Sequence, residues 1–84
     1  MRFYFHISND EITAEDEYGM ELPTFLAAFE EGSRIAQDLL NDLDTMDLHG
    51  GVIHIVGSQG RLFVSLPIVP LLKGAKVLRL ASHA

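Results

Sequence analysis

The chain contains no cysteine among its 84 residues, and it also lacks tryptophan. Without cysteine there is no disulfide bond, no thiolate metal site and no cysteine nucleophile. A chain of this length buries only about 60% of the surface that its unfolded form exposes, so its own core is marginal. Small domains without disulfides are usually stabilised by a very good core, a bound metal or a partner subunit. Of these alternatives we favour self-association.

Long apolar runs are also missing. No stretch reaches the roughly 18 consecutive apolar residues of a transmembrane helix. The opening residues 1–6 lack the apolar core and small-residue cleavage site of a signal peptide. Apolar residues make up 48% of the chain and charged residues 21%, a composition typical of a folded globular protein. We therefore expect a cytoplasmic protein.

Acidic residues are absent after Gly50, although the chain carries a net charge of −6. Up to Gly50 there are twelve acidic and two basic residues, a net of −10; beyond it there are four basic residues and no acidic one, a net of +4. Nucleic-acid binding depends largely on positive charge that neutralises phosphates. The acidic part argues against general nucleic-acid binding, and only the basic end leaves it open.

The first part of the chain predicts two strands. Residues 2–7 alternate and are rich in aromatic side chains, which is typical of a strand. After a short polar turn, residues 11–16 are predicted to return as a second strand with Ile12 and Ala14 facing the core. Residues 16–22 contain a glycine and are interpreted as a loop.

An amphipathic helix of about twenty residues is predicted after this loop. Pro23 suits the first helical turn, where its missing N–H costs nothing. Gly32 in the middle of the helix is explained either by a close crossing over the sheet or by drift. Residues 49–51 end the helical region. Apolar side chains recur at three- and four-residue steps at Phe25, Ala28, Phe29, Gly32, Ile35, Ala36, Leu39 and Leu43.

A second hairpin is predicted from residues 52–56 and 61–66, with a glycine-containing turn at 57–60. Together these elements predict an α+β fold: a two-layer ββαββ sandwich with a four-stranded, mainly antiparallel sheet and one helix on one face. Residues 1–67 form this domain, and residues 68–84 form a hydrophobic and basic C-terminal tail. The expected helix-facing side chains include Phe3, Phe5, Ile7, Ile53, Ile55, Leu62, Val64 and Leu66; the expected outward ones include Tyr4, His6, Val52, His54, Val56, Phe63 and Ser65.

Three segments resemble a family of short bacterial proteins catalogued as a domain of unknown function, family 6894. They are RFYFHI at 2–7, DEYGMELP at 16–23 and GRLFVSLP at 60–67. Members of that family open with Arg-Tyr-Phe-Phe-His and carry an Asp-x-x-Gly-x-Glu-Leu loop before the helix. This chain departs from them around the aromatic pair that follows Arg2 and in its longer tail. The resemblance supports the fold and implies no activity.

His6 and His54 are the candidate metal ligands. Both are predicted on the outer sheet face, where they would meet if their strands were neighbours. Two imidazoles with a carboxylate such as Glu15 would suit zinc or another borderline metal. No short motif fixes their spacing, so we favour the alternative that they are surface or interface histidines.

The acidic loop has two interpretations. Asp16, Glu17 and Glu21 offer oxygen ligands for calcium, but their spacing does not match an EF-hand. We favour a mechanical role, in which Gly19 permits a tight turn and Glu21 complements the helix dipole.

No catalytic motif is found. Residues 57–60 are not a phosphate-binding loop, because a strand and not a helix follows them. No serine has the flanking pattern of a nucleophile elbow. We assign no catalytic residue and no cofactor, and an enzyme would require a polar cleft that the sequence does not reveal.

Two surfaces remain as candidate interfaces. The outer sheet face, with Tyr4, Val52, Val56 and Phe63, is predicted to mediate self-association, although the tail could instead fold over it. In the tail, basic residues recur at three-residue steps at Lys73, Lys76 and Arg79.

The basic tail has three interpretations. It could dock on an anionic membrane or an acidic partner, pair with the protein's own acidic helix, or be an irregular surface segment. Two prolines and a glycine argue against membrane attachment. We therefore expect a non-catalytic homo-oligomeric interaction module, a homodimer in its simplest form; the alternative is a small-ligand or metal-binding sensor that uses His6 and His54.

Overall fold

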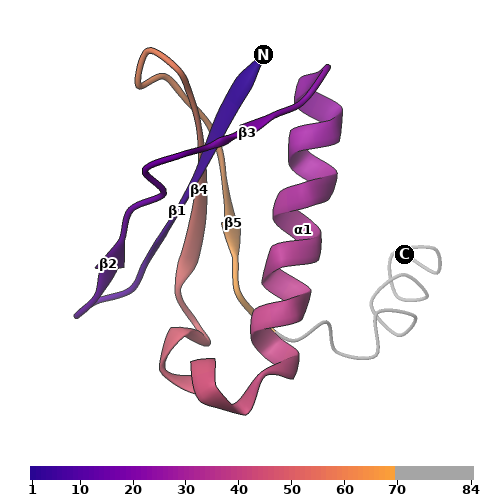
Figure 1. The fold of residues 1–84 in the computed structure, drawn as a ribbon. Helices are drawn as coiled ribbons and strands as arrows, with labels where there is room; N and C mark the ends of the chain where they lie inside the picture. Colours follow the sequence, from indigo (N-terminus) through magenta and orange to yellow (C-terminus); the bar gives the residue numbers. More distant parts are fainter. Residues whose placement is uncertain (70–84) are drawn as a thin grey trace, which may run out of the picture.

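In the computed structural model, which describes residues 1–69, an antiparallel sheet lies against one side of a single long helix (Figure 1). The predicted tail residues Lys73, Lys76 and Arg79 lie outside the described residues. The elements are β1 (Arg2–Ser8), β2 (Thr13–Ala14), β3 (Met20–Glu21), α1 (Phe25–Asn41), the 3-10 helix η1 (Leu43–Leu48), β4 (Val52–Gly57) and β5 (Leu62–Pro67).

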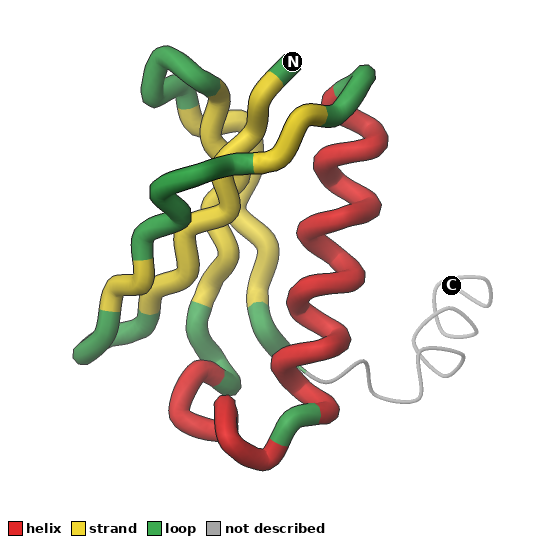
Figure 2. The backbone as a smooth tube through the Cα atoms, in the orientation of Figure 1, coloured by secondary structure: helices red, strands yellow, loops and turns green. Residues whose placement is uncertain are grey.

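The strands follow the order β2-β1-β4-β5, and β3 pairs with the same edge of β1 as β2 does (Figure 2). All of these pairs are antiparallel. The predicted α+β fold, with one helix on one face of the sheet, is confirmed. In the described part of the chain, no helix is long and apolar enough to cross a bilayer.

The core lies between α1 and the middle of the sheet. Gly32 is buried there, and a Cβ built on it would lie 2.9 Å from Ile55 Cδ1 and 3.0 Å from Leu66 Cδ1. The glycine is therefore explained by a close crossing of helix and sheet, one of the two predicted reasons. The fully or almost fully buried side chains are Phe3, Phe5, Ala28, Ala36, Ile53, Ile55 and Ile68.

The helix begins at Phe25, two residues after Pro23, which was predicted in its first turn. Thr24 is its N-cap, and its Oγ1 accepts a hydrogen bond from the N–H of Ala27 at 3.1 Å. Pro23 therefore precedes the cap instead of occupying the first turn. The helix ends at Asn41 because Asp42 is extended and its side chain caps η1. As a result Leu43, which was predicted on the buried face, is 81% exposed.

The second predicted strand is wrong in its extent and in its burial. Only Thr13 and Ala14 pair with β1, Ile12 is 41% exposed and Ala14 is exposed. The predicted loop, in turn, contains β3. The helix packs against β4 and β5, at a distance from β2 in the strand order.

A β-bulge in the second hairpin corrects two further predictions. Ile55 pairs with Val64, but Val56 pairs with Leu62, so Phe63 is an extra residue. Leu62 therefore joins the outer face. Phe63 instead contacts the ring of buried Phe3 at 5.6 Å, and it also contacts Phe25 of the helix at 5.5 Å.

The folded unit extends beyond the predicted boundary at residue 67. Ile68 is fully buried, and its N–H donates to the carbonyl of Gly51 at 2.9 Å. The N–H of Gly50 donates back to the carbonyl of Ile68 at 2.7 Å. The sequence placed Ile68 in the tail because Pro67 interrupts the strand pattern.

Candidate functional site

Three cross-strand rows form the middle of the outer face of the sheet, and the pair Arg2–Glu21 borders them. Residues directly opposite each other on neighbouring strands lie on the same face, so the register defines the rows. Tyr4, Val56 and Leu62 form an apolar row at the hairpin end of the sheet. The rows behind it are His6, His54 and Ser65, and then Ser8, Val52 and Pro67.

The two histidines lie directly opposite each other on β1 and β4, as the sequence predicted for neighbouring strands. Nδ1 of His6 accepts a hydrogen bond from the N–H of Asp16 at 3.0 Å. Because this nitrogen accepts, the neutral ring of His6 carries its proton on Nε2. The ring also stacks on Tyr4, with 6.3 Å between centroids.

His54 is held on both sides by hydroxyl groups. Its Nε2 lies 2.9 Å from Ser8 Oγ, and its Nδ1 lies 2.9 Å from Ser65 Oγ. A hydroxyl can donate or accept, so these two contacts suit either neutral tautomer and the imidazolium. The two contacts hold the ring between Ser8 of β1 and Ser65 of β5.

These bonds bear on metal binding. His6 could present Nε2 to a metal only by moving its proton to Nδ1 and losing the bond from Asp16. In residues 1–69, no three His, Asp or Glu side chains are grouped closely enough to hold a metal ion. The metal site at His6 and His54 stays a prediction.

An open polar cleft of about 370 Å³ adjoins His54 at the end of the sheet. Two of its residues brace the surrounding loops. Asn9 Nδ2 donates to the carbonyl of Asp47 at 2.7 Å, and His49 Nε2 donates to the carbonyl of Leu39 at 2.9 Å. The cleft is lined by Ser8, Asn9, Asp10, Glu11, His49, Gly50, Gly51, Val52 and His54.

The contact between Ser8 and His54 in this cleft has the spacing of a nucleophile and its base. Acyl transfer also requires N–H donors aimed at a developing oxyanion. The N–H groups of Gly50 and Gly51 line the cleft, but they donate to the carbonyls of Ile68 and Leu48. These two glycines therefore cannot supply an oxyanion hole, and we assign no catalytic residue.

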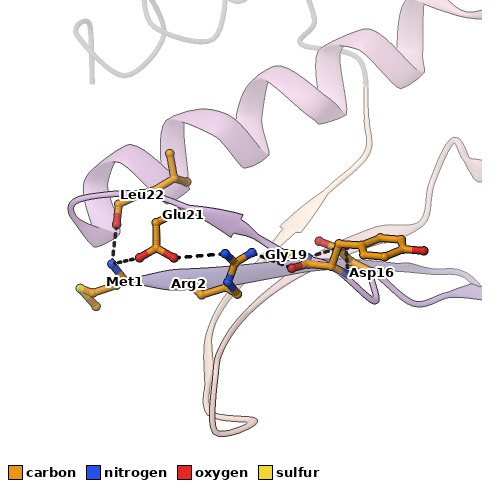
Figure 3. A network of polar contacts seen from close by, with 7 residues as sticks. Met1, Arg2, Asp16, Gly19, Glu21 and Leu22 are labelled. Carbon is orange, nitrogen blue, oxygen red and sulfur yellow. Dashed lines mark hydrogen bonds and ion pairs between the residues drawn. The ribbon is translucent and has the colours of Figure 1, made fainter.

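Asp16 organises the edge of the sheet between β2 and β3 (Figure 3). From the pair Ile7–Ala14 to the pair Arg2–Glu21, β1 advances five residues while its partner segment advances seven. Two extra residues therefore bulge out of the ladder. The Asp16 carboxylate fills this break, because Oδ2 accepts from the N–H of Phe5 at 3.1 Å.

The other oxygen of Asp16 closes the loop. Oδ1 accepts from the N–H of Tyr18 at 3.1 Å and from that of Gly19 at 3.0 Å. Gly19 has a φ of 73°, and a Cβ built on it would lie 2.9 Å from the carbonyl oxygen of Phe3. The tight turn that we predicted at Gly19 is therefore supported by these contacts, and Asp16 closes it.

Glu21 has a different role from the one predicted. It lies in β3 and not in the first turn of α1. Its Oε2 lies 2.8 Å from the N-terminal ammonium group of Met1, and its Oε1 lies 3.4 Å from Arg2 Nη2. These contacts hold the pKa of Glu21 below its usual range, chiefly through the hydrogen bond from the N-terminus. Glu21 thus joins the start of β1 to β3.

We expect acid to weaken the β2–β3 edge through Asp16. Partial burial raises the pKa of Asp16, but the N–H donors of Gly19, Phe5 and Tyr18, with the nearby His6, outweigh it and hold the pKa below its ordinary 3.8. A lowered folded-state pKa stabilises the fold above the unfolded-state pKa, and this contribution is lost as the pH falls through the folded value. Stability should therefore decline below about pH 4.

Urea unfolding of the wild type and of Asp16→Asn, at pH 7 and pH 3, tests this. The amide loses the charge and one acceptor, so at pH 7 it should lower the free energy of unfolding by about 1–2 kcal/mol, a figure reduced for partial exposure. At pH 3 the difference should shrink. Asp10→Asn in the exposed turn is the control, and an equal loss in both variants would contradict the role of Asp16.

Sequence reasoning missed several residues of the outer face. Leu62 was assigned inward because strict alternation leaves no place for a bulge. Ser8 was assigned to a turn, although it ends β1 and contacts His54. No local signal marks the bulge, but hydroxyl groups next to histidine positions on adjacent strands would have indicated the pairing of Ser65 with His54.

Comparison with known proteins gives one match. The model of a family described as a domain of unknown function (DUF6894) matches residues 2–69, which is more than half of the chain. Neither the curated proteins nor the solved structures include a significant match. The matched segment contains all the strands and helices described above.

Proposed function

The chain belongs to the family of the domain of unknown function DUF6894, and for this member we propose a non-catalytic role as a homo-oligomeric protein-interaction module. The observation that carries the proposal is the apolar outer face of the sheet. Tyr4, Val52 and Val56 are half-buried on it, and Leu62 is 56% exposed. Helix α1 packs against the other face.

Burial of this face would add to a small core. Seven apolar residues are buried in the described part of the chain, and side chains of the size of Leu62 gain about 1.5–3 kcal/mol each on full burial. Association of two copies would bury these side chains twice. This supports self-association as the source of stability that a short chain without disulfides needs.

Charge also favours a second copy on this face. Each copy carries a net charge of −6, so two copies repel each other over most of their surfaces. The three rows contain only Tyr, Val, Leu, His, Ser and Pro. These three rows thus form a surface without acidic side chains on which like-charged copies can meet; Glu21, at the border of this surface, is paired with Arg2.

Leu62→Asp is expected to dissociate the homo-oligomer into smaller species. Each copy would bury an unpaired carboxylate at the contact, so self-association should weaken by about 100-fold or more. Size-exclusion chromatography with light scattering on the full chain measures the change. Met46→Asp is the matched control, because Met46 is similarly exposed, at 57%, but lies in η1. A wild type that is monomeric at high concentration would refute the proposal.

A further inference from the structure

The outer edge of β5 is a second surface that has no partner strand in the described part of the chain. β5 ends the strand order β2-β1-β4-β5, so within residues 1–69 no strand pairs with its outer side. Strand edges of this kind present rows of N–H and C=O groups that can pair with another chain. At the other edge of the sheet β1 is already covered by β2, β3 and the Asp16 carboxylate.

The register identifies the backbone groups that point outward. The bond from the N–H of Ile68 to the carbonyl of Gly51 marks a hydrogen-bonded pair. Hydrogen-bonded pairs alternate along an antiparallel ladder, so Leu66 and Val64 are bonded to β4 in the same way. Ser65 lies between them, and its N–H and C=O therefore point away from β4 toward the open edge.

An uncharged groove of about 230 Å³ runs between this edge and the helix. Its walls include Ser33, Gln37 and Leu40 from α1, and Leu66, Pro67 and Val69 from β5 and the residues that follow it. None of the lining side chains is charged. The ion pairs of Arg34 with Glu31 and Asp38 lie on the exposed surface of the same helix, outside the lining of this groove.

We infer that the β5 edge pairs antiparallel with the β5 edge of a second copy. A two-fold axis through the strand pair would bring the uncharged groove of one copy beside that of the other, as an isologous contact requires. The helix stripes around Ser33 and Gln37 would then face each other above a continuous sheet. As on the outer face, an uncharged surface lets two strongly acidic chains approach.

This contact is separate from the outer-face association proposed above. If both contacts form and their two-fold axes cross at right angles, the assembly closes as a tetramer, and that tetramer rests on the proposed function. The edge contact itself does not depend on the proposed function. The oligomeric state of single variants therefore separates the two surfaces.

The test is Ser65→Pro in the full chain, measured by size-exclusion chromatography with light scattering. Proline removes the outward N–H of residue 65 and leaves the β4–β5 bonds in place. We expect a tetrameric wild type and a dimeric Ser65→Pro. Ser65→Ala is the control, because it loses the hydroxyl contact with His54 but keeps the N–H, and it should remain tetrameric.

Gln37→Glu tests the groove without altering the strand. In the edge-paired assembly it places two like charges near the axis, so it should weaken that contact at least 10-fold. Gln59→Glu, in the exposed turn of the hairpin, is its control. Circular dichroism confirms that each variant is folded, and Gln37→Glu decides the question if Ser65→Pro does not fold.

Each outcome decides between the surfaces. In one outcome, Leu62→Asp is the only variant that dissociates the oligomer, and Ser65→Pro and Gln37→Glu leave it intact. That result would overturn the edge contact and retain the proposed association through the outer face. The same result follows if residues 70–84 or another protein occupy the edge. An oligomer sensitive only to Ser65→Pro and Gln37→Glu supports the edge contact and refutes the outer face. A monomeric wild type overturns both.

Discussion

Gly19→Ala is expected to lower the free energy of unfolding by about 2–4 kcal/mol. A non-glycine residue at a φ of 73° costs about 1–2 kcal/mol. Overpacking in a rigid environment adds about 1–3 kcal/mol. Here the new Cβ would lie 2.9 Å from the backbone oxygen of Phe3, which cannot move without disturbing β1.

Gly60→Ala is the matched control for this experiment. Gly60 has a similar φ of 82°, but a Cβ on it would meet no atom within 4 Å. The control should lose only the conformational part, about 1–2 kcal/mol. Urea unfolding followed by circular dichroism measures both variants. Equal losses would mean that the close approach of Gly19 to β1 contributes nothing.

Phe3→Ala is expected to lower the free energy of unfolding by about 3–5 kcal/mol, the range for deletion of a buried aromatic side chain. Phe3 is fully buried and contacts the ring of Phe63. Small domains are stable by only about 5–15 kcal/mol, so this loss removes a large part of the total. The variant should melt at a markedly lower temperature or fail to fold.

Phe25→Ala separates burial from ring contact. Phe25 contacts the same ring of Phe63, at 5.5 Å, but is 39% exposed. Its truncation should cost about 1–2 kcal/mol, because water already covers part of the side chain. Thermal unfolding of both variants provides the comparison. A cost for Phe25→Ala as large as that for Phe3→Ala would show that the aromatic cluster, and not burial, holds this end of the sheet.

The strand β1, the helix and the second hairpin could be predicted because each has a strong local pattern. Phe3 and Phe5 alternate with Arg2, Tyr4 and His6, and Ile53 and Ile55 lie in a short run of β-branched residues in β4. Successive side chains of a strand point to opposite faces, so a sequence pattern with a period of two predicts which side chains are buried. Gly32 could be noticed for the same reason, since it interrupts an otherwise regular apolar stripe.

The edge formed by β2 and β3 could not be predicted from a local sequence pattern. Its strands have two residues each, too few for a periodic signal. Their position depends on the Asp16 carboxylate, which accepts a backbone N–H eleven residues away in Phe5. Contacts between residues so far apart in the sequence depend on the three-dimensional fold, so no local pattern predicts them. The family resemblance included Asp16 and Gly19 but did not reveal what they do.

For this protein, then, the sequence by itself determined the fold class, the helix, the main strands and the side chains of the central core. Tertiary structure decided which strands are neighbours, and so placed His6 opposite His54. It also placed Leu62, and not Phe63, on the outer face, because one bulged residue reverses the alternation of side chains along β5. Local periodicity sets which side chains are buried, whereas register and edges depend on contacts between distant segments.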